Sequence, residues 1–398
     1  MNQEYWTLPV DCPTDCKWGE RMKPIGIYLH FPFCKRKCSY CDFNSYSGLE
    51  ELMDEYTKAL IRQMETAEAG LAVRSLFFGG GTPSLLPPDR LIEVLEAADR
   101  RFKLLPETEI TLEANPATVT AEALKRLRNA GFNRLSIGLQ TSQDRLLEAI
   151  GRIHRWSDFT DIFHGAREAG FTNIGIDLIF GLPGQTTADW QETLAAVTAL
   201  EPEHLSAYGL QLEEGTPLWE WVEKGQVRLP AEEETLAMME RAMKFLPEAG
   251  YEHYEISNYA KPGYASRHNL GYWLGEDYLG FGAGATSTFK GKRWTHLEDP
   301  AEYIRRVGAG LSTVAEEERL DETTRAEERL LLGLRLRSGV GLSEFKERYG
   351  PDLARSLHGP LEYLIGNGWL EMKEGRLRLT DKGVMISNTV IAKLLSEI

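Results

Sequence analysis

The 398-residue chain is poor in cysteine, in positive charge and in long apolar runs. Its five cysteines all lie in the first 41 residues, so a fold stapled throughout by disulfides is excluded. The 45 Lys and Arg against 60 Asp and Glu give a net charge of −15, which disfavours nucleic acid as a partner. No apolar run is long enough for a transmembrane helix, and the N-terminus lacks a secretory signal pattern. We therefore expect a cytoplasmic protein without a transmembrane segment.

The chain does contain short apolar runs that alternate with segments of helical period, which is typical of an α/β fold. Six runs predict the strands of a parallel sheet: Ile25–His30, Ser75–Phe78, Glu109–Glu113, Arg134–Leu139, Asn173–Phe180 and His204–Tyr208. Six strand–helix units fall short of the eight that close a full barrel, so we predict a partial (β/α)6 barrel. Functional side chains are expected at the carboxyl ends of its strands.

Changes in composition and in the predicted secondary structure divide the chain into four parts. These are an N-terminal tail (1–22), the barrel (23–250), an aromatic-rich connecting region (251–315) and a C-terminal domain (316–398). The aromatic region favours either a flat apolar ligand or the packing of an edge. The last part shows helical patterns at 324–336, 343–349 and 353–367 and then a hairpin turning near 373–375, which predicts a small winged-helix-like α+β domain. Packing over the barrel is favoured for it over DNA binding.

Three cysteines form a C-x3-C-x2-C motif directly after the first predicted strand: Cys34, Cys38 and Cys41. Three thiolates on one loop can each bind one iron of a [4Fe–4S] cubane and leave the fourth iron open for an exchangeable ligand. A structural zinc site is the alternative, but it normally recruits a fourth Cys or His with paired spacing. Cys12 and Cys16 repeat part of the spacing and lack a third member.

A glycine run, GGGTP at residues 79–83, follows the second predicted strand. Glycines lack Cβ, so we expect backbone donors here to approach the carboxylate and amino end of a ligand closely. With both motifs at strand ends, residues 24–212 resemble the radical S-adenosylmethionine (SAM) superfamily. That resemblance implies a [4Fe–4S] cluster on the three cysteines and SAM bound at its open iron.

Within the superfamily, the sequence is similar to the anaerobic coproporphyrinogen oxidases. This similarity implies that nine residues near the motifs and strand ends contact SAM: Tyr28, Tyr40, Gly80, Gly81, Thr82, Glu113, Gln140, Arg152 and Asp177. The alternative for the polar members is a structural role as caps or in salt bridges at the barrel end.

Two departures separate the chain from these oxidases. The oxidases carry a further cysteine two residues after the triad, where this chain has Phe43. Residues 267–273 read RHNLGYW, which resembles the H-N-x-x-Y-W motif of the HemW proteins, a family associated with binding haem and handing it on. The resemblance implies a haem chaperone that serves haem-accepting proteins, respiratory ones among them, and no catalytic residue is assigned.

The haem expectation centres on His268, because imidazole is a good axial ligand of haem iron. Asn269 is expected to orient the imidazole through its other nitrogen, while Tyr272 and Trp273 supply faces for the porphyrin. The alternative is that His268 is an ordinary structural histidine and the two aromatic residues fill space beside the C-terminal domain. Three functions stay open: haem chaperone, coproporphyrinogen oxidase and winged-helix regulator. The oligomeric state is also open, and a homodimer is one alternative.

Overall fold

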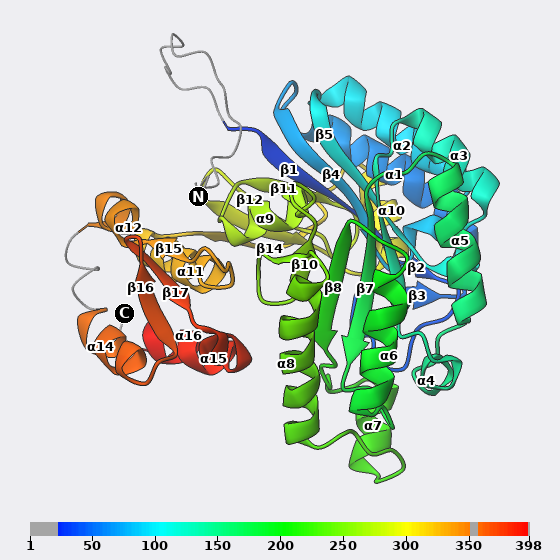
Figure 1. Ribbon diagram of the computed structural model, residues 1–398. Helices are drawn as coiled ribbons and strands as arrows, with labels where there is room; N and C mark the ends of the chain where they lie inside the picture. Colours follow the sequence, from blue (N-terminus) through cyan, green and yellow to red (C-terminus); the bar gives the residue numbers. More distant parts are fainter. Residues whose placement is uncertain (1–22, 351–356, 397–398) are drawn as a thin grey trace.

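The computed structural model describes residues 23–350 and 357–396, so Cys12 and Cys16 lie outside the described residues. Figure 1 shows a long twisted sheet flanked by helices, with the C-terminal domain packed to one side. Among the helices of the described ranges, none combines the length and the apolar character that crossing a membrane requires.

Six parallel strands form the centre of the sheet and pair in chain order. They are β1 (Ile25–Phe31), β4 (Ala72–Gly80), β5 (Lys103–Ala114), β6 (Arg134–Gln140), β7 (Ile174–Phe180) and β8 (His204–Gly209). Each contains or overlaps one predicted strand, which confirms the α/β partial-barrel prediction. Because successive side chains of a strand alternate between faces, Ile27 and Leu76 pack against the helices while their neighbours Tyr28 and Phe77 face the barrel interior.

Helices cover the outer face of these strands. They are α1 (Met53–Thr66), α2 (Pro88–Arg101), α3 (Ala121–Ala130), α5 (Trp156–Glu168), α6 (Thr187–Thr198) and α8 (Glu232–Glu248). The short helices α4 (Asp144–Ala149) and α7 (Pro217–Glu223) lie beside the loop after β1, where the Ser39 amide donates to the Ile150 carbonyl and the Leu218 amide donates to the Ser39 carbonyl. In α1, Tyr56, Leu60 and Met64 are fully buried at a spacing of four residues, which places them on one stripe of the helix. Such stripes hold the helices on the sheet and leave the carboxyl ends of the strands open.

The predicted connecting region adds strands to both edges of the sheet. β9 (Glu252–His253) and β10 (Asn258–Ala260) follow β8, while β11 (Tyr278–Phe281), β12 (Thr286–Phe289), β13 (Lys292–His296) and β14 (Val314–Arg319) extend the sheet beyond β1. β11 pairs in parallel with β1, and the others on that side are antiparallel. The sheet therefore continues past the predicted domain boundary at residue 250. The predicted domain boundary at residue 315 falls inside β14. Between these strands lie α9 (Arg267–Trp273) and α10 (Pro300–Gly308).

The C-terminal domain has its own core and a three-stranded sheet. Its elements are α11 (Glu322–Gly333), β15 (Val340–Gly341), α12 (Leu342–Tyr349), α14 (His358–Gly366), β16 (Leu370–Lys373), β17 (Arg376–Leu379), α15 (Asp381–Met385) and α16 (Ser387–Leu395). The predicted hairpin is present, and the start of the predicted 353–367 helix lies outside the described residues. The Arg293–Glu328 ion pair at 2.6 Å and the Arg335 guanidinium over the Trp273 ring join this domain to the sheet and α9.

Candidate cluster and cofactor site

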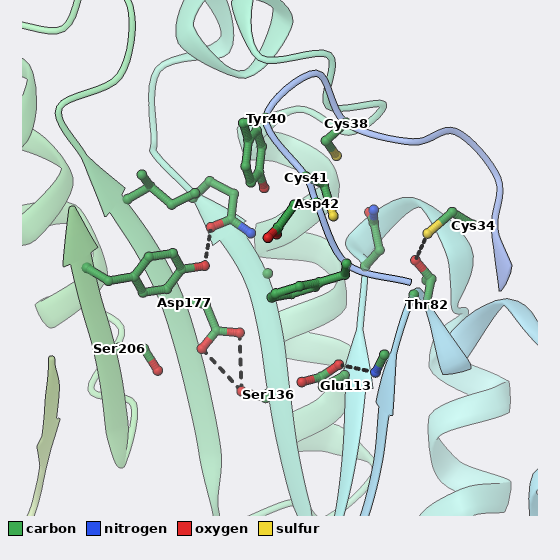
Figure 2. Close-up of a pocket in the computed structure, with 18 of the residues that line it drawn as sticks. Cys34, Cys38, Tyr40, Cys41, Asp42, Thr82, Glu113, Ser136, Asp177 and Ser206 are labelled. Atoms are coloured by element: carbon green, nitrogen blue, oxygen red, sulfur yellow. Dashed lines mark hydrogen bonds between the residues drawn. The ribbon is translucent and has the colours of Figure 1, made fainter. Parts of the chain in front are cut away.

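The three motif cysteines lie on the loop after β1, at the carboxyl ends of the parallel strands (Figure 2). Cys34 ends the short strand β2 (Phe33–Cys34), which pairs in parallel with β3 (Tyr46–Ser47) and so anchors the start of the loop. Cys34 is buried, Cys38 and Cys41 are half-buried, and all three are free thiols. Together they line a cavity of about 630 Å³.

Polar contacts hold two of the sulfurs. Sγ of Cys34 lies 3.5 Å from Oγ1 of Thr82, and Nη1 of Arg152 donates to Sγ of Cys38 at 3.6 Å. Burial raises the pKa of the Cys41 thiol, so an iron ion must displace its proton to bind the thiolate. Within the described ranges no three His, Cys or carboxylate side chains converge on a single metal ion. A cubane does not require this convergence, because each thiolate binds a separate iron.

The glycine run packs tightly against the cysteine loop. Gly80 has a φ of +112°, and a Cβ there would stand 2.6 Å from the His30 ring. A Cβ on Gly81 would stand 2.7 Å from the carbonyl oxygen of Phe33, the residue before Cys34. The glycines are thus needed for the chain to fit against itself. The expected close approach of a ligand gains no support from these contacts, although both glycines line the cavity.

Two carboxylates face the cavity from neighbouring parts of the sheet. Oε2 of Glu113 accepts the Gly80 amide at 3.1 Å, and the Asp177 carboxylate accepts the Ser136 hydroxyl at 3.2 Å (Figure 2). Burial and the charge of Asp177 raise the pKa of Glu113 to about 8, and burial likewise raises the pKa of Asp177. Neither carboxylate forms an ion pair with a described residue, so these predicted positions suit a ligand that carries a positive charge.

The remaining predicted SAM contacts, among them Tyr28 and Tyr40, also line this cavity. Gln140 ends β6 in the left-handed region, with a φ of 76°, and its Oε1 accepts the Tyr208 hydroxyl at 3.3 Å. Arg152 donates to the Gly138 carbonyl at 2.5 Å and to Cys38, while its buried Nε has no partner in the described structure. A residue with φ above zero and an incompletely satisfied guanidinium are strained features of the kind found at binding sites.

His268 lies on α9 at the inner wall of the same cavity, with only 2% of its surface exposed. Nδ1 of its ring lies 3.0 Å from the Ser75 hydroxyl, Nε2 lies 2.9 Å from the Tyr272 hydroxyl, and the ring stacks on Phe77. Burial, together with the nearby Arg74 and Arg134, lowers the pKa of His268 to about 3. The imidazole is therefore neutral, which is the form that binds metals, but both of its nitrogens are engaged within the protein.

The other three residues of the RHNLGYW motif that the haem expectation names lie in different surroundings. Asn269 and Tyr272 line the cavity, whereas Trp273 does not, since its ring packs under Arg335 of the C-terminal domain. The expectation that Asn269 orients the imidazole is wrong, because Ser75 and Tyr272 hold the two ring nitrogens. The structural alternative for Trp273, filling space beside the C-terminal domain, agrees with its observed packing.

Comparison with known proteins places this geometry in a family. Residues 28–197 match the radical SAM superfamily and residues 320–386 match the HemN C-terminal domain. The heme chaperone HemW of Bacillus subtilis is 38% identical, over 94% of this chain and 100% of its own length. The corresponding protein of Lactococcus lactis is 35% identical, over 94% of this chain and 98% of its own. The chain belongs to the HemW family.

The HemW assignment confirms the resemblance that the cysteine and RHNLGYW motifs carry. The fold also resembles that of Escherichia coli HemN, a coproporphyrinogen III oxidase described as a radical SAM enzyme, with a TM-score of 0.83 at 22% identity. The match covers 95% of this chain and 91% of HemN, so the whole architecture, including the C-terminal domain, is shared.

Sequence reasoning missed several residues that line the cavity of this HemW chain or hold its groups. They are Ser75, Phe77, Arg134, Ser136, Ser206 and Tyr208. The period of two along each predicted strand is the signal that could have found them, because each lies an even number of positions from another inward-facing residue. Glu109 was also missed; its carboxylate accepts the Arg267 and His268 amides at 3.1 Å and so anchors the start of α9.

Proposed function

We propose that this HemW chain is a haem chaperone that carries a [4Fe–4S] cluster, binds SAM and delivers haem to acceptor proteins. One observation carries the proposal: His268, Asn269 and Tyr272 line the same cavity as the three free cysteines. The cluster loop and the family's haem motif, more than 200 residues apart in the chain, thus meet at one site. We further propose that it acts in the cytoplasm, with respiratory haem proteins among its acceptors, and that a homodimer can form.

Cys34, Cys38 and Cys41 would hold the cluster, which when bound would supply an open iron for the amino and carboxylate groups of SAM and an electron for SAM. The protein's own groups fit such a ligand. Among the described residues, Glu113 and Asp177 have no ion-pair partner, and the buried Nε of Arg152 has no hydrogen-bond partner. Tyr28, Tyr40, Gly80, Gly81, Thr82 and Gln140 complete the proposed SAM contacts.

For haem, we propose that His268 would bind the iron. Its Nδ1 is held by Ser75, which fixes the ring as orienting partners do at metal sites. Its Nε2 becomes free only when the Tyr272 hydroxyl moves away. In this proposal Tyr272 protects the ligand atom until haem arrives, while Asn269 contacts the cargo and Trp273 secures α9 against the C-terminal domain.

Oxygen-independent coproporphyrinogen oxidation is the second candidate, and the shared HemN fold favours it. Against it stands Phe43, which replaces the additional cysteine of the oxidases with a side chain 64% exposed at the cavity mouth. A phenyl ring can neither donate a hydrogen atom as a thiol does nor bind iron. We therefore expect no protoporphyrinogen IX from coproporphyrinogen III under anaerobic reducing conditions with SAM.

The deciding experiment loads anaerobically reconstituted protein with haem and mixes it with the apo-form of a respiratory haem protein. The chaperone proposal predicts faster activation of the acceptor than free haem gives at the same concentration. Activation at the rate of free haem, or formation of protoporphyrinogen IX in the oxidase assay, would contradict it.

A further inference from the structure

A second cavity system lies outside the cluster site, between the sheet edge and the C-terminal domain. Two adjoining cavities of about 430 and 500 Å³ are lined by residues of β11–β13 and by helices α11 and α12. Both are lined by residues 275–277, Arg325, Arg329 and Arg348. They form one cleft, which we call the arginine cleft.

Part of the charge at the arginine cleft is neutralised within the protein. Three ion pairs do this: Arg293 with Glu328 at 2.6 Å, Lys290 with Glu68 at 2.7 Å, and Arg74 with Glu276 at 3.1 Å. In the part of the chain that the structure describes, the lining groups without an ion pair are four cations and two carboxylates: Lys23, Arg325, Arg329, Arg348, Asp277 and Glu344. The cleft is thus locally positive on a chain whose net charge is −15.

Arg329 is the most constrained of these cations. It stands four residues after Arg325 on α11, a spacing at which like charges repel on a helix. Its Nη1 is buried and has no hydrogen-bond partner among the described residues. Burial, together with the charges of Arg376 and Arg348, lowers the pKa of this guanidinium. A half-buried cation with an unsatisfied donor is costly unless an anion completes it.

The cleft also offers aromatic surface and adjoins the cluster cavity. Tyr272, Tyr278 and Tyr349 line it, and the rings of Tyr272 and Tyr278 meet edge to face at 4.6 Å. Tyr272 lines the cluster cavity as well, so this side chain belongs to the wall that the two share. Rotation of Tyr272 would release Nε2 of His268 and open the wall toward the cleft.

We propose that the arginine cleft binds the propionate carboxylates of haem, an inference that rests on the proposed function. The guanidinium groups of Arg325, Arg329 and Arg348 match carboxylates in charge and in their capacity for paired hydrogen bonds. The tyrosines cover the flat apolar body of the porphyrin. The propionates then lie on the far side of Tyr272 from the cysteine loop, while the porphyrin reaches past Tyr272 toward His268 and Asn269 on the wall of the cluster cavity.

The test compares haem with haem dimethyl ester, in which both carboxylates are masked, by Soret titration of the reconstituted full-length protein. Wild type should bind haem ~10- to 100-fold more tightly than the ester, as expected for charge-assisted hydrogen bonds. Arg325→Gln combined with Arg329→Gln should weaken haem binding and leave ester binding unchanged. The exposed Arg348→Gln, which disturbs no core, should reduce the preference part of the way.

A matched control is Arg100→Gln on α2, an exposed arginine in an ion pair with Glu96, which should leave both affinities unchanged. If wild type binds haem and the ester equally, or if the arginine variants keep the preference for haem, the cleft does not bind the propionates. The proposal that the protein binds haem is unaffected by either result. Absence of binding by both porphyrins overturns the proposed function and the cleft together. If the arginine variants bind haem as wild type does but inorganic phosphate inhibits haem binding, the cleft is a phosphate site.

Discussion

The hydroxyl of Tyr272 lies 2.9 Å from Nε2 of His268, the nitrogen that a haem iron would need. With Ser75 on Nδ1, no ring nitrogen is left for a ligand in this conformation. Haem ligation by His268 therefore competes with a hydrogen bond inside the protein, and the strength of that competition can be measured.

Tyr272→Phe removes the competing hydroxyl and keeps the ring. A buried hydrogen bond is worth about 1 kcal/mol, so haem affinity should rise by about fivefold if His268 is the ligand. His268→Ala should instead weaken affinity ~10- to 100-fold and shift the Soret band, by analogy with other perturbed metal sites. Soret titration and the absorption spectrum of each variant measure both effects.

The cluster serves as the internal control for these variants, because its ligands lie on a different element. Iron and sulfide content should match wild type in both. A His268→Ala protein with the wild-type haem spectrum and affinity would show that this histidine is structural, and that another residue binds the iron.

Gly81→Ala tests whether the glycine run supports the cysteine loop. The added methyl would meet the Phe33 backbone at 2.7 Å, so the loop that begins with Cys34 must shift. We expect a lower cluster content after reconstitution and a destabilisation of about 1–3 kcal/mol, as for overpacked sites. Gly308→Ala is the control, since a Cβ there meets nothing within 4 Å and its φ needs no glycine. Equal cluster content in both variants would show that Gly81 does not support the cysteine loop, and would favour its role in letting a ligand approach the backbone.

The six central strands and the cluster loop were predictable because local patterns determine them. Apolar runs of four to eight residues specify strands of a parallel sheet, and the cysteine motif needs only one loop. Glu113 and Asp177 were predicted as SAM contacts from the family resemblance, and their strand-end positions agree with their place on the cavity wall.

Contacts between distant segments were not predictable in the same way. Ser75 and His268 are 193 residues apart, and only the fold shows that β4 delivers a hydroxyl to the imidazole. The edge strands of residues 251–315 were not predictable for a related reason. Their segments are short and interrupted by glycines, so they show little of the alternation of apolar and polar residues that marks a strand. Adjacency in the sequence favours Asn269 as the residue that orients the imidazole, yet Ser75 and Tyr272, which are not adjacent to His268, hold the two ring nitrogens.

Each cysteine of the triad should be indispensable for the cluster. Cys34→Ala, Cys38→Ala and Cys41→Ala should each abolish the [4Fe–4S] absorption and EPR signals, because a cubane needs three protein thiolates beside its open iron. Cys12→Ala and Cys16→Ala should retain both signals, and they control for loss of a thiol as such. Four irons per chain in the Cys38→Ala protein would refute the assignment.

The ionisation of Glu113 should make stability fall as pH rises. Burial and the charge of Asp177 raise the pKa of Glu113 to about 8, whereas the unfolded chain ionises it near 4.5. Between these values the unfolded state binds fewer protons, so the free energy of unfolding decreases with pH by up to about 1.4 kcal/mol per pH unit. Stability from the protonated carboxyl is complete below about pH 4.5 and is lost as pH rises toward 8.

Glu113→Gln removes this ionisation, so the difference in free energy of unfolding, variant minus wild type, should increase by about 2 kcal/mol between about pH 6.5 and 8. Any constant cost of the amide cancels in this comparison. Denaturant unfolding of the cluster-free protein measures the difference at each pH. Glu107→Gln, which changes a water-exposed carboxyl on the same strand, is the control for replacing a carboxyl as such. A difference for Glu113→Gln that does not change with pH would mean that the cavity already stabilises the charged carboxylate, and SAM would then have no unmet charge to satisfy there.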